Sequence, residues 1–105
     1  MTPHVAAGER LKRALEQSAE RAGFTIDWVS ERTSPFTSPS FVGGSHDLCL
    51  LVGSSDGGEC EWLDQLDEHA FALPGFVLAQ MDVGTVEPQG DGWMVSMEAL
   101  TIKEA

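Results

Sequence analysis

The residues of this 105-residue chain that could do chemistry are two cysteines, three histidines and a glycine-rich segment. One of the histidines and both cysteines lie between Gly44 and Trp62, around the sequence GSSDGGE. An apolar run followed by a glycine loop and a helix start is a common way to hold a phosphate. A phosphate site also needs a cation, but the nearest basic residues along the chain are Arg32 and Lys103. We therefore interpret the segment as a turn and a helix cap, with Ser55 or Asp56 as the capping residue.

The histidines and cysteines do not have the spacing of a metal site or of a catalytic pair. His46 and Cys49 would point to opposite faces of a strand, because side chains alternate along it. Cys60 is the better thiol candidate because it lies near a helix N-terminus, but Glu59 and Glu61 disfavour its thiolate. We expect no catalytic residues, no metal and no cofactor, and a non-catalytic protein fits better than an enzyme.

The charge of the chain is unevenly distributed. The formal net charge is −11, yet five basic and five acidic residues balance each other over residues 1–32. Residues 33–102 contain eleven acidic residues and no Lys or Arg. Such a surface repels nucleic acids and anionic membranes, and no apolar run approaches the roughly 20 residues of a membrane span. We expect a cytoplasmic protein with no nucleic-acid and no membrane partner.

The apolar residues predict a mixed fold in a single α+β domain over residues 1–105. Thr2 and Pro3 are typical of a helix start, an apolar stripe follows, and Gly23 is typical of a helix end. A second helix is expected from about residue 59 to 71, and strands are expected at 24–29, 47–52, 76–86 and 93–102. The order predicts two αββ units that form a four-stranded antiparallel sheet with two helices on one face, a permuted ferredoxin-like arrangement.

Residues 30–46 are rich in Ser, Pro and Gly, and we interpret them as a long loop. A loop of this length could cover a small-molecule cleft beside the sheet. The candidate lining residues are Trp28, Arg32, Phe36, Phe41 and His46.

The strands carry more apolar side chains than two helices on one face can bury. An uncovered apolar face of a sheet marks an interface or a covered site, so we expect this face to be buried by a homodimer that packs sheet on sheet, or by the loop 30–46 folded over it. The candidate interface residues on this open sheet face are Val77, Ala79, Met81, Val83, Val95 and Met97.

Three functions follow from these patterns. The first is a non-catalytic, homodimeric interaction or regulatory module, which could also bind another protein. The second is a small-molecule-binding protein or enzyme that uses the cleft under residues 30–46. The third is an acidic mimic of nucleic acid, which requires ordered rows of carboxylates. The expected second helix offers a short row of this kind in Glu61, Asp64 and Glu68.

Overall fold

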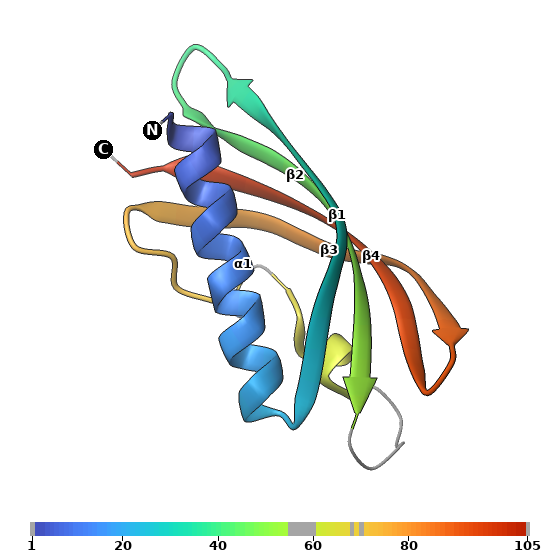
Figure 1. Ribbon diagram of the computed structural model, residues 1–105. Helices are drawn as coiled ribbons and strands as arrows, with labels where there is room; N and C mark the ends of the chain where they lie inside the picture. The colour runs from blue at the N-terminus through green and yellow to red at the C-terminus, as the bar shows by residue number, and fades with distance from the viewer. Residues whose placement is uncertain (1, 55–60, 68, 70, 105) are drawn as a thin grey trace.

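The structure is a computed structural model that describes residues 2–54, 61–67, 69 and 71–104. Its elements in chain order are helix α1 (Pro3–Arg21), strands β1 (Phe24–Thr37) and β2 (Val42–Ser54), the short 3-10 helix η1 (Glu61–Gln65), and strands β3 (Phe76–Gln89) and β4 (Gly92–Lys103). The strands form one antiparallel sheet in the order β1-β2-β4-β3. Helix α1 lies across one side of this sheet (Figure 1). The predicted α+β class and the four-stranded antiparallel sheet are therefore confirmed.

Helix α1 forms where the sequence predicts it. Thr2 occupies the N-cap position, although its side chain makes no capping hydrogen bond, and Pro3 is in the first turn. Gly23 follows the helix with a φ of 87°, a backbone conformation that glycine adopts without steric cost. One stripe of the helix is buried against the sheet and contains Ala7, Gly8, Leu11, Leu15 and Ala19.

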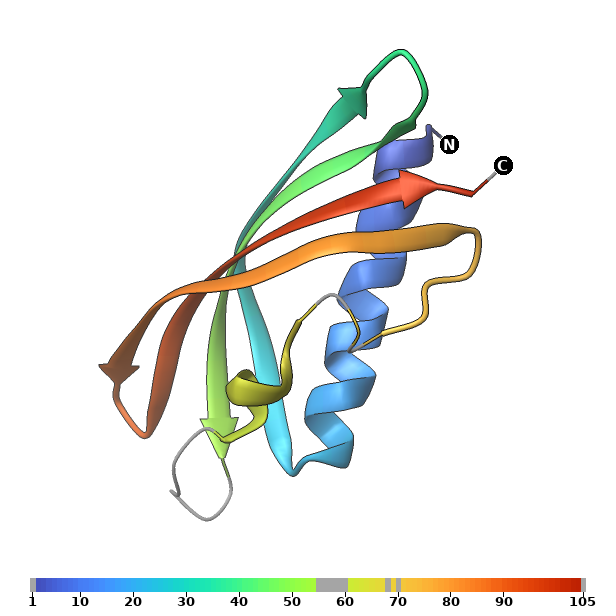
Figure 2. The same ribbon diagram turned by 180° about the vertical axis from the view of Figure 1, so that it is seen from behind.

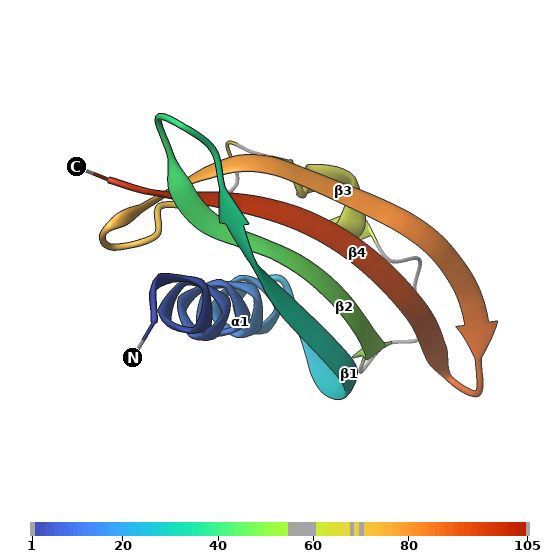
Figure 3. The same ribbon diagram turned by 90° about the horizontal axis from the view of Figure 1, so that it is seen from above.

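The two faces of the sheet differ in what covers them. One face, which we call the helix face, carries Leu48 and Leu50 of β2 and Val95 and Met97 of β4, all of them buried in the core under α1. Figure 3 shows α1 along this side of the curved sheet. The other face, which we call the open face, carries the alternate residues of the same strands. Along β2 and β4 the expected alternation of side chains is therefore present.

The segment around η1 completes the core on the helix face. Trp62 is buried, stacks on Phe24 with ring centroids 6.5 Å apart, and donates a 2.9 Å hydrogen bond from Nε1 to Ser18 Oγ of α1. Leu63 and Leu66 belong to the same buried cluster. Seen from behind, η1 lies on the same side of the sheet as α1 (Figure 2).

The predicted second helix and the two αββ units are not confirmed, because the described residues contain one α-helix and the short η1. Leu66 N–H bonds to Leu63 O, three residues earlier, which is the tighter 3-10 pattern. The Asp67 carboxylate then accepts the backbone N–H of His69 at 2.8 Å. Aspartate favours such local bonds over helix propagation. The predicted cap at Ser55 or Asp56, like Cys60, lies outside the described residues.

Residues 30–46 are not a loop. They form the end of β1, the turn and the start of β2 in one long hairpin. β1 extends to Thr37, β2 begins at Val42, and the turn is closed by hydrogen bonds between Ser38 and Phe41. Pro35 suggested a loop because proline cannot donate to a strand ladder. It is tolerated here because β1 is an edge strand, and edge strands can accept proline.

Three β-bulges in the edge strands change which side chains face outward. In β1 the register shifts between Trp28 and Ser30, and in β3 it shifts between Leu78 and Gln80 and again between Val83 and Val86. Each bulge adds one residue, so the side chains beyond it exchange faces. Simple alternation would place Arg32 and Asp82 toward the helix, whereas the bulges place them on the open face.

Candidate functional site

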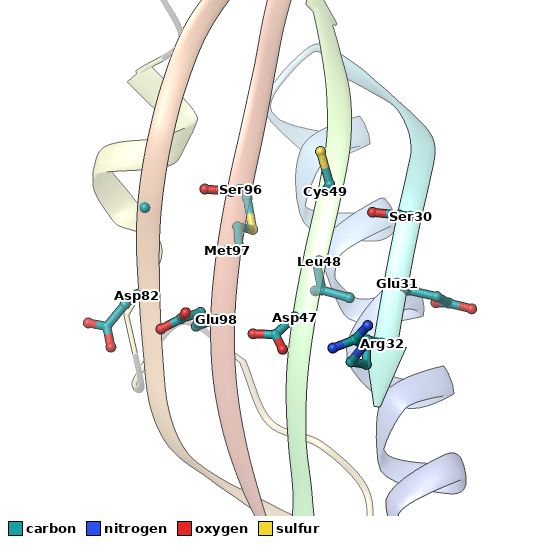
Figure 4. A pocket seen from close by; sticks show the side chains of 11 residues that line it. Ser30, Glu31, Arg32, Asp47, Leu48, Cys49, Asp82, Ser96, Met97 and Glu98 are labelled. Atoms are coloured by element: carbon teal, nitrogen blue, oxygen red, sulfur yellow. The ribbon is translucent and has the colours of Figure 1, made fainter. Parts of the chain in front are cut away.

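Four charged residues form a row across the open face of the sheet. Arg32 of β1 is the register partner of Asp47 of β2, Asp47 is the partner of Glu98 of β4, and Glu98 is the partner of Asp82 of β3. We call this set the charged row. Figure 4 shows the four side chains side by side along it. All four residues are exposed, so the row presents one cation and then three carboxylates on neighbouring strands.

The charged row borders a second row of small side chains. These are Ser30, Cys49, Ser96 and Gly84, again one residue from each strand, and we call them the small row. The two rows line a hollow of about 540 Å³ on the open face. A second hollow of about 230 Å³ continues on the other side of Asp47 and Glu98. Larger side chains at these four positions would fill the hollow. The groove therefore depends on the small size of the residues in the small row.

The β3 side of the groove is held in place by hydrogen bonds. Ser96 Oγ accepts the backbone N–H of Thr85 at 2.8 Å and lies 2.9 Å from the Thr85 hydroxyl. A Cβ on Gly84 would lie 2.7 Å from Ser96 Oγ, so a side chain at residue 84 would force Ser96 to move. These contacts fix the irregular part of β3 against β4 and keep the groove open.

The charged row opposes the stability of the sheet. Like charges directly across a pair of strands are destabilising, and the row contains two such pairs, Asp47 with Glu98 and Glu98 with Asp82. Within the described residues no ion pair joins Arg32 to Asp47. Natural proteins break local rules of this kind mainly at functional sites, and bulges are frequent there too. The row is therefore the strongest candidate for a functional site.

The five residues of the predicted cleft do not come together. Trp28 and His46 lie on the helix face, where Trp28 donates to Glu16 and His46 is completely buried. Arg32 and Phe36 lie on the open face, and Phe41 is 53% exposed in the hairpin turn. These five residues therefore do not line one cleft, because most of residues 30–46 belong to the sheet. Of the five, Arg32 belongs to the groove described above.

The six predicted interface residues also do not share one face. Met81, Val95 and Met97 are buried in the core on the helix face, and Val83 packs partly buried against them. Val77 is 50% exposed on the open face, and Ala79 is exposed at the β3 bulge. The expectation of one apolar open face made of these six residues is therefore corrected. The β3 bulge between Leu78 and Gln80 places Met81 and Val83 on the helix face instead of the open face. The centre of the open face carries charged residues.

His46 is a structural residue of the core. Its Nδ1 lies 3.1 Å from Thr33 Oγ1 and its Nε2 lies 2.9 Å from Thr101 Oγ1. Thr101 donates onward to Gly44 O, which favours a neutral ring that donates from Nε2 and accepts at Nδ1. Helix α1 approaches the ring at Gly8, where an added Cβ would meet Thr33 Oγ1 at 3.0 Å. Desolvation by burial lowers the pKa of His46, nearby His4 acts in the same direction, and Asp47 opposes them.

The lowered pKa of His46 predicts a pH-dependent stability. The unfolded chain has a His46 pKa of about 6.5, above that of the folded chain. At pH values between the two, the imidazole is protonated more often in the unfolded chain than in the folded chain. The free energy of unfolding therefore falls as the pH drops below about 6.5, by at most about 1.4 kcal/mol per pH unit from this residue. Urea unfolding across this pH range, in wild type and in His46→Gln, measures the effect. The wild-type slope should be steeper.

The control is the same comparison between about pH 8 and 9, where an imidazole is neutral in the folded and in the unfolded chain. There the slopes of wild type and His46→Gln should be equal. Equal slopes below about pH 6.5 would show that His46 titrates alike in the folded and unfolded chain, and would contradict the buried neutral ring.

Three further findings concern metal binding, membrane crossing and similarity to known proteins. Within residues 2–54, 61–67, 69 and 71–104, no three His, Cys, Asp or Glu side chains are arranged to hold a metal ion. None of the helices in this described part combines the length and apolar character that a membrane crossing requires. No family model, no curated protein and no solved structure matches the chain.

The three carboxylates of the row were not predicted as a group. Asp47, Asp82 and Glu98 are isolated acids in three different strands. One signal was present, since each is an acidic residue within an expected strand and next to an apolar residue. Their common row depends on strand register and on the β3 bulge, which single-sequence patterns do not encode.

Proposed function

We propose that the protein is a non-catalytic binding module that presents its open sheet face to a basic segment of another protein. The supporting observation is the charged row beside the groove, where three exposed carboxylates stand on adjacent strands. Asp27 of β1 and Glu87 of β3 add two more acids to the same face. Complementary charge of this kind steers association and selects the partner.

The edges of the sheet are less suited to binding than its face. β1 and β3 are the edge strands, and each contains a proline, Pro35 and Pro88, that removes a backbone donor. Each edge strand also contains a bulge. Proline and bulges are devices that prevent a further strand from pairing. A partner is therefore expected on the face.

Charge also argues against the homodimer expected from the sequence. Sheet-on-sheet packing of two copies would bring the carboxylates of one copy near those of the other. A single Arg32 in each row cannot compensate three carboxylates, so a basic partner fits this face better than a second copy. Light scattering tests this, and a species of 11.3 kDa is the expected result. The homodimer would be supported instead if the wild-type protein formed a stable dimer and either Val77→Asp or Glu98→Lys dissociated it.

The proposal is tested by binding of short poly-L-lysine, measured by calorimetry at physiological salt. The variant Asp47→Asn/Asp82→Asn/Glu98→Gln removes the carboxylates of the row and keeps their size. Three exposed ion pairs at ~0.2–1 kcal/mol each predict a loss of about tenfold in affinity.

The matched control is Glu9→Gln/Glu20→Gln/Asp64→Asn, which removes three exposed acids from α1 and η1. It changes the net charge by the same amount and should bind nearly as wild type does. Equal losses in the two triple variants would mean that the peptide senses net charge alone. In that case the open face would not be a specific site.

A second candidate, the acidic mimic of nucleic acid, is favoured by the same row. Such a mimic needs ordered carboxylates, and the structure offers them on the sheet rather than on the expected second helix. It would be a special case of the proposed module, with a nucleic-acid-binding protein as the partner. Competition between this protein and DNA for a basic partner would separate it from a general binding role. The cytoplasmic location expected from the sequence remains a prediction.

A further inference from the structure

We infer that the partner segment is a basic amphipathic α-helix that lies across the strands, along the groove. This inference rests on the proposed function and adds the conformation and the direction of the bound segment. It is carried by the spacing of the charged row, by the shape of the groove and by the side chains that follow the groove on its other side.

The spacing of the carboxylates matches the pitch of a helix. Asp47, Glu98 and Asp82 stand on adjacent strands, and neighbouring strands lie about 4.8 Å apart. One turn of an α-helix advances about 5.4 Å along its axis. A helix laid across the strands with one Lys or Arg per turn therefore places one cation near each carboxylate.

The side-chain spacing of an extended segment laid in the same direction does not match the spacing of the carboxylates. Its side chains on one face repeat about every 6.7 Å, so each successive cation would fall about 2 Å further from its carboxylate. A segment running along the strands would meet mainly the carboxylate of one strand. The row therefore selects a helix that crosses the strands.

The groove has the dimensions of such a helix. It crosses four strands, or about 14 Å, which corresponds to roughly nine residues of helix. Along β2, the charged row at Asp47 and the apolar position at Leu51 are separated by about 13 Å of strand. The small row, which contains Cys49 and Ser96, lies between them and lets a helix approach the sheet.

The row beyond the small row is apolar at its centre. Leu51 and Met94 are register partners, both are partly exposed, and Met94 Sδ lies 3.5 Å from Cys49 Sγ. Methionine is common where a binding surface must adapt to a helix. A partner helix would thus place its basic side on the charged row and its apolar side on Leu51 and Met94.

The test compares two synthetic peptides of identical composition. In the first, lysines repeat at i, i+4 and i+7 with leucines on the adjoining face. In the second, the same residues alternate, as in a strand. Circular dichroism confirms that the first is helical when bound. We expect the helical isomer to bind wild-type protein about tenfold more tightly, and the preference to disappear in Asp47→Asn/Asp82→Asn/Glu98→Gln.

The outcomes separate this inference from the proposed function. Equal binding of the two isomers, or tighter binding of the alternating one, overturns the helical partner and leaves the basic partner in place. If neither isomer binds while poly-L-lysine binds through the row, the helix is again overturned. If neither isomer nor poly-L-lysine binds through the row, the proposed function fails as well. Loss of binding in Met94→Ser, with the charged row intact, would support the apolar contact.

Discussion

Replacing Val95 by Asp is expected to unfold the protein at room temperature. Val95 is completely buried at the centre of β4 on the helix face. An unpaired carboxylate there costs several kcal/mol, against a total stability of about 5–15 kcal/mol for a small domain. Loss of the near-ultraviolet circular dichroism signal, together with a shift of the urea midpoint, measures the effect.

The matched control for this change is Val77→Asp on β3. Val77 has the same side chain in the same sheet, but it is 50% exposed on the open face. The new carboxylate therefore remains in water, and stability should change by less than about 1 kcal/mol. If the two variants were equally stable, or if Val77→Asp were the unfolded one, the assignment of the two faces would be wrong.

Replacing Trp62 by Ala is expected to produce the second large loss of stability. Trp62 is 2% exposed and joins three parts of the fold: η1, Phe24 of β1 and Ser18 of α1. Removing a buried Trp side chain costs about 3–5 kcal/mol. Urea unfolding, followed by far-ultraviolet circular dichroism, measures the loss.

Trp62→Phe separates packing from hydrogen bonding at this position. It keeps an aromatic ring near Phe24 and removes the bond to Ser18, so a smaller loss of about 1 kcal/mol is expected. A Trp62→Ala variant as stable as Trp62→Phe would show that η1 is not anchored in the core.

The sequence predicted the parts of the fold that depend on short-range patterns. The stripe of Ala7, Leu11, Leu15 and Ala19 repeats with the helical period, and Gly23 marks its end, so α1 was predictable. Leu48, Leu50 and Val52 likewise alternate with outward residues in a strand that contains no bulge. In these segments local preference and tertiary packing agree.

The errors have physical causes that single-sequence patterns do not contain. The Leu63 to Leu66 spacing fits an α-helix, but the chain makes a 3-10 turn there, and the bond from the His69 N–H to Asp67 competes with continuation of the helix. Pro35 is compatible with a strand only at an edge, and strand order is a property of the whole sheet. Tertiary packing therefore determined the secondary structure of both segments, the one around η1 and the one around Pro35.

The candidate site was less predictable than the fold. Its members come from four strands, and two of them, Arg32 and Asp82, face the groove because of bulges in the edge strands. A one-residue change of register moves every later side chain to the other face. The uneven charge of the sequence predicted an acidic surface, but only the register shows that three carboxylates form a row.

The most direct test of the central claim is to map where a basic helix binds. Isotope-labelled protein is titrated with the helical lysine peptide, and the amide chemical shifts are followed by nuclear magnetic resonance. We expect the largest changes at Cys49, Ser96 and Glu98 on the open face, and little change at Leu11 and Leu15 of α1. Changes concentrated on α1, or spread evenly over the acidic residues of the whole surface, would contradict a binding site on the open face.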